Sequence, residues 1–183
     1  MSIFSDTFPT LHTARLNLTE ITPGQAPELF RLFTDSRVTE YYNVVPLQEE
    51  KDIVPVIHRF HQRYKDKTAI RWGISLKNSP ELIGTAGYNS YIRGHRGVIV
   101  YELAHEWWNK GLASEAIREV IQYGFHELAL DRIEAEVMPG NAASEKVLEK
   151  NGFRFEGLLR HWMQWDSKFL DINMWSILKQ DVV

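Results

Sequence analysis

The segment "AHEWWNKGLASEAIREVI", residues 104–121, changes from a strand-like to a helical pattern around a glycine and two small residues. Gly111 lets the chain turn tightly or approach a ligand closely, because glycine has no Cβ. Ala113 and Ser114 follow it at the start of the helix, where the first backbone N–H groups have no intrahelical partners. Such N–H groups, at the positive end of the helix dipole, bind anions. The pattern predicts an anion site; the alternative is a solvated turn.

A second polar spacing lies where "VMPG" leads into "NAASEKVLEKNGF". Asn141 is placed as the N-cap of a helix, and Gly152, after Asn151, as its left-handed C-cap. Ser144 then lies in the first turn of this helix. From the residues alone, the two positions indicate helix capping and a first-turn polar residue.

Other chemistries find little support in the residues. The chain has no cysteine, which excludes disulfides, thiolate catalysis and cysteine-ligated zinc. The nucleophile motif GxSxG and the Rossmann and Walker glycine patterns are not matched. His58 and His61 have metal-ligand spacing, but the sequence offers no third ligand beside them, so we expect no metal site.

The size and charge of the chain limit what the sites can serve. The 183 residues predict one domain, residues 1–183, with a core that holds many of the aromatic side chains. A formal charge of -3 argues against nucleic acid as the main partner. The start "MSIFSDTFPTLHTARL" does not resemble a signal peptide, and no apolar run is long enough to span a membrane. We expect a soluble cytoplasmic protein without a membrane partner.

The elements that must position these residues follow from periodicity. Alternation predicts strands at residues 15–21, 69–76, 81–91, 97–104 and 132–138, with two or three more at 153–178 around the "DSK" turn. Helical spacing predicts helices at residues 23–35, 49–64, 112–128 and 142–150, where Pro55 marks a true start or a kink. Leu112, Ala116, Val120 and Leu128 form one apolar stripe. The order predicts an α/β protein with a mixed sheet and helices.

The segments "WWNKGLASEA" and "LDRIEAEVMPGNAASEKVLEKNGFRFEG", in this order, resemble the GNAT superfamily of acetyl-CoA-dependent N-acetyltransferases. The closest resemblance is to the Rim-type group, which includes enzymes that acetylate the N-termini of ribosomal proteins. It extends to "TARLNL", "WGISLKNSPELIGTAGY" and "NGFRFEG", and so covers nearly the whole chain. The resemblance implies a GNAT fold, in which a mostly antiparallel central sheet with a splayed strand pair is flanked by helices.

The resemblance also implies a coenzyme site. In the family, a Gln/Arg-x-x-Gly-x-Gly/Ala loop holds the pyrophosphate of coenzyme A, and here Trp108 departs from its first position while Gly111 and Ala113 match. The implied loop residues are Trp108, Asn109, Lys110, Gly111, Leu112, Ala113 and Ser114. The preceding strand would splay and offer backbone groups of Leu103 and His105 to the pantetheine arm; the alternative is an ordinary edge strand.

Asn141 and Ser144 match the Asn-x-x-Ser of the family. The resemblance implies that Asn141 reaches the pantetheine amide and that Ser144 lies near the thioester sulfur, where it protonates the leaving thiolate. These roles are compatible with helix capping.

The general base is not evident. The positions where family members carry a glutamate fall near Gly97 and Met163. Glu102, His105 and His161 are candidate substitutes, and Glu102 is the one that we assign as catalytic, although such residues are more often solvated or structural. Glu156 is expected to stabilise its own turn.

A weak base suits one class of acceptor. About a tenth of an α-amine with pKa near ~8 is free base at pH 7, against less than about a thousandth of a lysine amine. We therefore expect direct transfer of acetyl to a protein or peptide N-terminal α-amine, such as that of a ribosomal protein. A small amine acceptor, or a coenzyme-binding sensor without catalysis, stays open, as does a monomer or a homodimer. Aromatic candidates for the acceptor pocket, rather than the core, are Tyr41, Tyr42, Trp107, Trp108 and Trp162.

Overall fold

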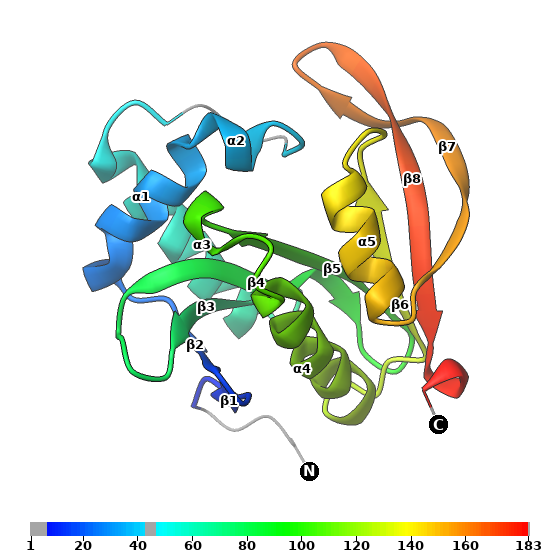
Figure 1. Ribbon diagram of the computed structural model, residues 1–183, viewed down its shortest axis with the longest axis horizontal. Helices are drawn as coiled ribbons and strands as arrows, with labels where there is room; N and C mark the ends of the chain where they lie inside the picture. Colours follow the sequence, from blue (N-terminus) through cyan, green and yellow to red (C-terminus); the bar gives the residue numbers. More distant parts are fainter. Residues whose placement is uncertain (1–6, 43–46, 183) are drawn as a thin grey trace.

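The computed structural model describes residues 7–42 and 47–182, which contain one sheet in the order β1-β2-β3-β4-β5-β6-β8-β7 (Figure 1). The strands are β1 (Leu11–His12), β2 (Leu16–Glu20), β3 (Ile70–Leu76), β4 (Leu82–Ile92), β5 (Arg96–Leu103), β6 (Arg132–Val137), β7 (Arg154–Trp165) and β8 (Lys168–Leu178). Neighbouring strands are antiparallel except β5 and β6, which are parallel. The predicted α/β fold with a mixed, mostly antiparallel sheet is confirmed.

The helices of the described residues are α1 (Ala26–Thr34), α2 (Ser36–Thr39), α3 (Val54–Lys65), α4 (Leu112–His126) and α5 (Ala142–Lys150), with short 3-10 turns at η1 (Pro23–Gln25), η2 (Glu50–Ile53), η3 (His105–Trp107) and η4 (Lys179–Asp181). Pro55 lies in the first turn of α3, where its missing N–H costs nothing, so it marks the start of the helix and not a kink. Leu128 is buried but lies beyond the end of α4, and the prediction of a helix up to this residue is wrong. The sequence reading did not include β1 and α2.

Two apolar clusters hold the helices to the sheet. The larger one joins α4 and α5 to the central strands through residues such as Leu112, Ala116, Val120 and Leu148, all of them buried. The smaller one joins α1 and α3 through Leu29 and other aliphatic residues. Each fully buried leucine or valine side chain contributes about 1.5–3 kcal/mol. This packing fixes the ends of α4 and α5 relative to β5.

The two central strands β5 and β6 diverge. They pair only where Arg96–Val98 meet Arg132–Glu134; beyond this point β6 continues along β8 alone. On the other side of β5, the pairing with β4 shifts between Tyr88 and Ser90, so that Asn89 is an extra residue opposite the point of divergence. A bulge of this kind bends and twists the strands around it. The predicted splayed strand pair is confirmed, and the bulge lies on β4.

We expected Glu156 to stabilise its own turn, and this expectation is wrong. Glu156 lies in β7 beside a bulge and accepts hydrogen bonds from Arg132 of β6, at 2.8 and 2.5 Å, and from Ser176 of β8, at 2.6 Å. The Arg132 guanidinium and the Ser176 hydroxyl lower the pKa of Glu156 to about 2. The carboxylate therefore links three strands; sequence reasoning missed this because strand β8 separates β6 from β7 in the sheet.

Two further features concern membranes and metals. None of the helices in residues 7–42 and 47–182 has the length and apolar character needed to cross a lipid bilayer. The same residues contain no group of three or more His, Asp or Glu side chains placed to hold a metal ion. His61 instead places Nε2 2.7 Å from the carbonyl oxygen of Ile21, a contact between α3 and the end of β2.

Candidate active site

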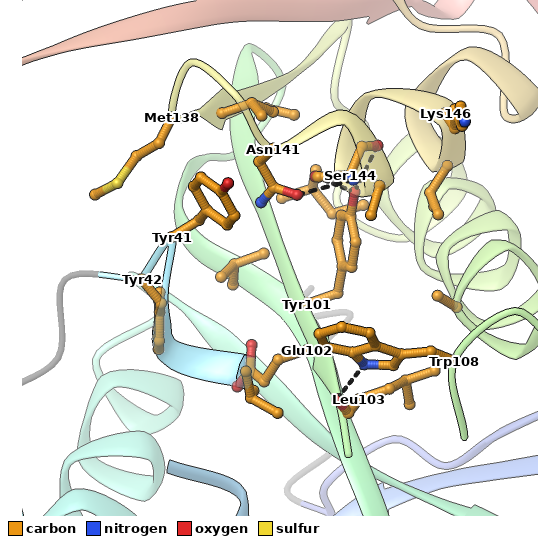
Figure 2. A pocket seen from close by; sticks show the side chains of 18 of the residues that line it. Tyr41, Tyr42, Tyr101, Glu102, Leu103, Trp108, Met138, Asn141, Ser144 and Lys146 are labelled. Carbon is orange, nitrogen blue, oxygen red and sulfur yellow. Dashed lines mark hydrogen bonds between the residues drawn. The ribbon is translucent and has the colours of Figure 1, made fainter. Parts of the chain in front are cut away.

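A cleft of about 430 Å³ opens where β5 and β6 diverge. Residues 98–103 of β5 form one wall, and residues 135–138 at the end of β6 form the other. The loop before α4 and the first turns of α4 and α5 close its ends. Figure 2 shows the cleft with Asn141 and Ser144 on one side and Trp108 and Glu102 on the other.

The loop before α4 has the conformation of an anion site. Asn109 and Gly111 both have positive φ, 58° and 74°, and Gly111 is the N-cap of α4. A Cβ on Gly111 would meet only the Arg15 Nη2, at 3.6 Å, so there is room for a side chain here. Glycine is favoured because the backbone is left-handed. The first intrahelical bond runs from Glu115 N–H to the Gly111 carbonyl, which leaves the N–H groups of residues 112–114 for a ligand.

Arg15 and Glu115 hold this loop in place. The Arg15 guanidinium donates to the Lys110 carbonyl at 3.0 Å and to Glu115 Oε2 at 2.6 Å, and Thr13 donates to Glu115 Oε1 at 2.5 Å. These bonds lower the pKa of Glu115 although burial raises it. The sequence reading missed this contact between the β1–β2 turn and α4, because the partners are far apart in the chain.

The edge of β5 that faces the cleft carries free backbone groups. Ala104 N–H donates to Ile83 of β4 at 2.9 Å, so the alternate residues Leu103 and Tyr101 direct their backbone groups toward the open edge. Trp108 Nε1 donates to the Leu103 carbonyl at 2.7 Å. The indole therefore caps the end of the strand, which gives tryptophan a physical role at the position where the family commonly has Gln or Arg.

The predicted coenzyme residues gather around the cleft with two exceptions. The described residues that line it include Leu103, Trp108, Asn109, Gly111, Leu112, Ala113, Ser114, Asn141 and Ser144. The two exceptions, His105 and Lys110, are not among the described lining residues. The His105 ring contacts Trp108, at 4.9 Å between centroids, and its Nδ1 lies 3.2 Å from Arg37 Nη1. The ammonium of Lys110 lies 4.5 Å from the centre of the Trp107 ring. Lys146 and Lys150 of α5, which sequence reasoning passed over, line the cleft instead.

Asn141 caps α5 as predicted, because its Oδ1 accepts the Ser144 N–H at 3.1 Å. The Ser144 hydroxyl lies 2.6 Å from the hydroxyl of Tyr101, which projects from β5 (Figure 2). Tyr101 was not among the predicted residues. Burial raises the pKa of Tyr101 to about 12 although the bond to Ser144 lowers it.

Glu102 is part of a buried polar group beneath the cleft. Its Oε1 accepts hydrogen bonds from Arg71 and, at 2.6 Å, from Thr85, and the side chains of Glu102 and Arg71 are only 7% and 5% exposed. Oε2 is buried and accepts no hydrogen bond from any described residue. Tyr42 approaches Arg71 Nη2 at 3.4 Å, and burial raises the pKa of Tyr42. This arrangement suits a counter-charge for Arg71; a role as base stays a prediction.

Two other positions considered for the general base, His161 and Met163, lie on β7 and not on the strand of Glu102. His161 has φ 51° in an irregular part of β7, donates its N–H to Asp171 at 2.8 Å and stacks on Phe169. Met163 lines the cleft, at the position where we noted a possible family glutamate. Glu136 of β6 also lines the cleft.

The aromatic residues divide between cleft and surface. Tyr41, Tyr42, Trp107 and Trp108 line the cleft, and their place in an acceptor pocket stays a prediction. Trp162 is not among the described lining residues: it is 53% exposed and donates through Nε1 to Glu136 at 3.1 Å.

A second hollow, of about 480 Å³, continues from the cleft past Tyr41 and Met138, which line both. Its other walls are Glu40, Pro139, His161, Phe169, Leu170 and Asp171. The hollow lies between the end of α2 and the β7–β8 hairpin, at the far end of the cleft from the loop before α4. It is open to solvent and carries two carboxylates beside aromatic rings.

Comparison with known proteins identifies this geometry. The profile of the acetyltransferase (GNAT) domain family matches residues 15–154. The chain belongs to this family. The uncharacterized N-acetyltransferase YoaA of Bacillus subtilis is 40% identical over 173 residues, which cover 94% of this chain and 98% of the relative. The protein is thus an N-acetyltransferase of the GNAT family, and an acyltransferase as predicted.

Two further matches belong to the Rim-type group. The [ribosomal protein uS5]-alanine N-acetyltransferase of Escherichia coli is 29% identical over 146 residues, 74% of each chain. The structure of Mycobacterium smegmatis RimJ in complex with CoA-disulfide superposes with a TM-score of 0.84 at 20% identity, and the match covers 98% of this chain and 90% of that one. The second match shows that the fold is shared.

Proposed function

We propose that this N-acetyltransferase transfers the acetyl group of acetyl-CoA directly to the N-terminal α-amine of a protein or peptide. The free-base amine nitrogen forms a bond to the thioester carbonyl carbon and the carbon–sulfur bond breaks. The proton that the nitrogen loses balances the one that the sulfur takes up, through solvent, so that coenzyme A leaves as the thiol. The observation that carries the proposal is the cleft at the divergence of β5 and β6, with an anion site at one end and an open hollow at the other.

The residues of the cleft fit acetyl-CoA. The N–H groups of residues 112–114 and the left-handed Asn109 and Gly111 suit a pyrophosphate, and Lys146 and Lys150 of α5 bring positive charge to the same cleft. The backbone groups of Tyr101 and the N–H of Leu103, whose carbonyl is occupied by Trp108, suit the amides of an extended pantetheine arm, which would add to the sheet edge.

Positioning and polarisation account for the chemistry in this proposal. A backbone N–H on the edge of β5 would polarise the thioester carbonyl, and a fixed donor of this kind contributes about 2.7–4 kcal/mol in other enzymes. Holding the amine against the carbonyl carbon supplies the rest of the rate acceleration. The chain has no cysteine, and we assign no covalent enzyme intermediate.

The second hollow supports a polypeptide acceptor. A small amine would be enclosed by the cleft, whereas a peptide whose N-terminus enters the cleft needs a path for the residues that follow. Tyr41 and Met138 line both spaces, so the path leads from the cleft into the hollow. The Escherichia coli relative that is named for the alanine of uS5 acts on such an acceptor.

The test is a panel of acceptors assayed with acetyl-CoA. Peptides with a free N-terminus should be acetylated, and kcat/KM should rise with length from one residue to about five or six, as the second hollow fills. Peptides with a blocked N-terminus are the matched control and should be inert. Polyamines or free amino acids acetylated faster than every peptide would support the small-amine alternative. Binding of coenzyme without transfer to any acceptor would indicate a sensor.

A further inference from the structure

We infer that Tyr101 is a positioning residue for acetyl transfer: its hydroxyl donates to Ser144 Oγ and so directs the Ser144 O–H toward the leaving sulfur. The inference deepens the proposed function and rests on it, because it assigns a partner to Ser144, which the family resemblance puts near the thioester sulfur. Both side chains line the cleft, Tyr101 from β5 and Ser144 from the first turn of α5.

Two oxygens of Ser144 lie within reach of the Tyr101 hydroxyl, and we take the nearer one as the acceptor of its proton. Tyr101 Oη lies 2.6 Å from Ser144 Oγ and 3.2 Å from the Ser144 carbonyl oxygen. Hydrogen bonds between two oxygens are about 2.5–3.0 Å long, so the shorter contact is the strong one. A hydroxyl has one proton to donate, and with Oγ accepting from Tyr101 the serine proton points elsewhere.

The N-cap holds the backbone of Ser144 in place. The Ser144 N–H donates to Asn141 Oδ1 at 3.1 Å, which fixes the first turn of α5 next to β5. Figure 2 shows Tyr101 reaching across from its strand to the serine, with Asn141 beside them. The three residues join β5 to the first turn of α5.

Acidity separates positioning from proton donation. Burial raises the pKa of Tyr101 to about 12, whereas a free thiol has a pKa near ~8.5. Complete transfer of the tyrosine proton to the thiolate would therefore be unfavourable by a factor of roughly a thousand or more. Tyr101 keeps its proton at neutral pH and stays a donor. This also changes the expected role of Ser144, which stabilises the thiolate by a hydrogen bond instead of protonating it.

The first test is a double-mutant cycle with Tyr101→Phe and Ser144→Ala. Phenylalanine keeps the ring, so the fold should survive. Tyr101→Phe should lower kcat roughly tenfold and leave the KM for acetyl-CoA within about twofold, because the bond matters most as charge grows on sulfur. In the Ser144→Ala background, Tyr101→Phe should lower kcat less than about twofold, since the two residues act as one unit. A kcat near wild type in Tyr101→Phe, or fully multiplicative losses in the double variant, would overturn the inference.

Tyr88→Phe is the matched control. The Tyr88 hydroxyl is also buried and donates to the Val120 carbonyl at 2.9 Å, but Tyr88 does not line the cleft. This variant should lose stability and keep kcat. If Tyr88→Phe lowered kcat as much as Tyr101→Phe does, the effect of Tyr101 would be general loosening of the core, and the inference would fail.

A second readout needs no acceptor. The thiol of coenzyme A bound to the protein can be titrated by the ultraviolet absorbance of its thiolate. If the serine proton is directed at the sulfur, the pKa of the bound thiol should be lower in wild type than in Tyr101→Phe or Ser144→Ala. Equal values in all three proteins would overturn the inference. Because this measurement requires only coenzyme binding, it remains decisive if no acceptor in the panel is acetylated.

Discussion

At the scale of single residues, the cleft combines groups that act through their own backbone, such as Gly111 and Asn141, with side chains that act through a partner on another element, such as Tyr101. Gly111 and Asn141 could be assigned from the sequence because a left-handed turn and an N-cap depend on adjacent residues. Tyr101 and Arg15 could not, because each acquires its role from a residue on another element. Glu102 was found, but as a catalytic candidate, without the buried Arg71 that occupies one of its oxygens.

The Arg71–Glu102 pair yields a prediction at this scale. Arg71→Leu should destabilise the protein by about 3–5 kcal/mol, because it leaves a buried carboxylate without its counter-charge. Arg71→Leu combined with Glu102→Leu should recover most of this loss, since replacing a buried pair by apolar groups is often neutral. Urea unfolding measures both.

The same double variant tests the role of Glu102 in catalysis. If Glu102 serves only as the counter-charge, the folded double variant should keep kcat within about fivefold of wild type, a change of about 1 kcal/mol. A loss of a hundredfold or more in folded protein would show that the carboxylate takes part in proton transfer, as we first predicted from the sequence.

At the scale of elements, periodicity and turn residues were sufficient for nearly every helix and strand. The exceptions are the short elements β1 and α2, which have too few residues to show a period, and the end of the helix at Leu128, which is buried after the helix has ended. The splay came from family resemblance, because no local pattern marks where two strands stop pairing. The extra residue Asn89 lies on the neighbouring strand β4, so the sequence of β5 alone does not predict it.

The loop before α4 gives a prediction at this scale. Gly111→Glu should abolish coenzyme A binding in calorimetric titration, because it places a carboxylate at the expected pyrophosphate position. Gly94→Glu is the matched control: Gly94 has nearly the same φ, 71° against 74°, and no other atoms lie near its Cβ position. Both variants carry a backbone strain of about 1–2 kcal/mol, and only the first should lose affinity. Equal affinities would remove the assignment of the anion site.

The link between β6, β7 and β8 predicts a pH dependence. The pKa of Glu156 is held at about 2, below its ordinary value of 4.5, so its contribution to stability is complete above pH 4.5 and is lost as the pH falls toward 2. Because the carboxylate is 41% exposed, we expect Glu156→Gln to cost only up to about 1 kcal/mol at neutral pH. The difference from wild type should shrink to nearly zero near pH 2. A difference independent of pH would contradict the ionic link.

At the scale of the whole molecule, the two apolar clusters hold the walls of the cleft, and a ligand that fills the cleft should stabilise the fold. Acetyl-CoA at about a hundred times its dissociation constant should add ~2.7 kcal/mol to the free energy of unfolding. For a chain of this length that corresponds to a rise in Tm of roughly 5–11 °C. NAD and ATP at equal concentration should give much smaller shifts. Equal shifts from all three would indicate a general anion site.

The most direct measurement is the position of the acetyl group on a product. A peptide with a free N-terminus and an internal lysine is incubated with acetyl-CoA and the protein, and the product is fragmented in a mass spectrometer. The proposed function predicts one acetyl group, on the N-terminal α-amine, with the lysine unmodified and no product from the Gly111→Glu variant. Acetylation of the lysine alone, or of polyamines but of no peptide, would contradict it.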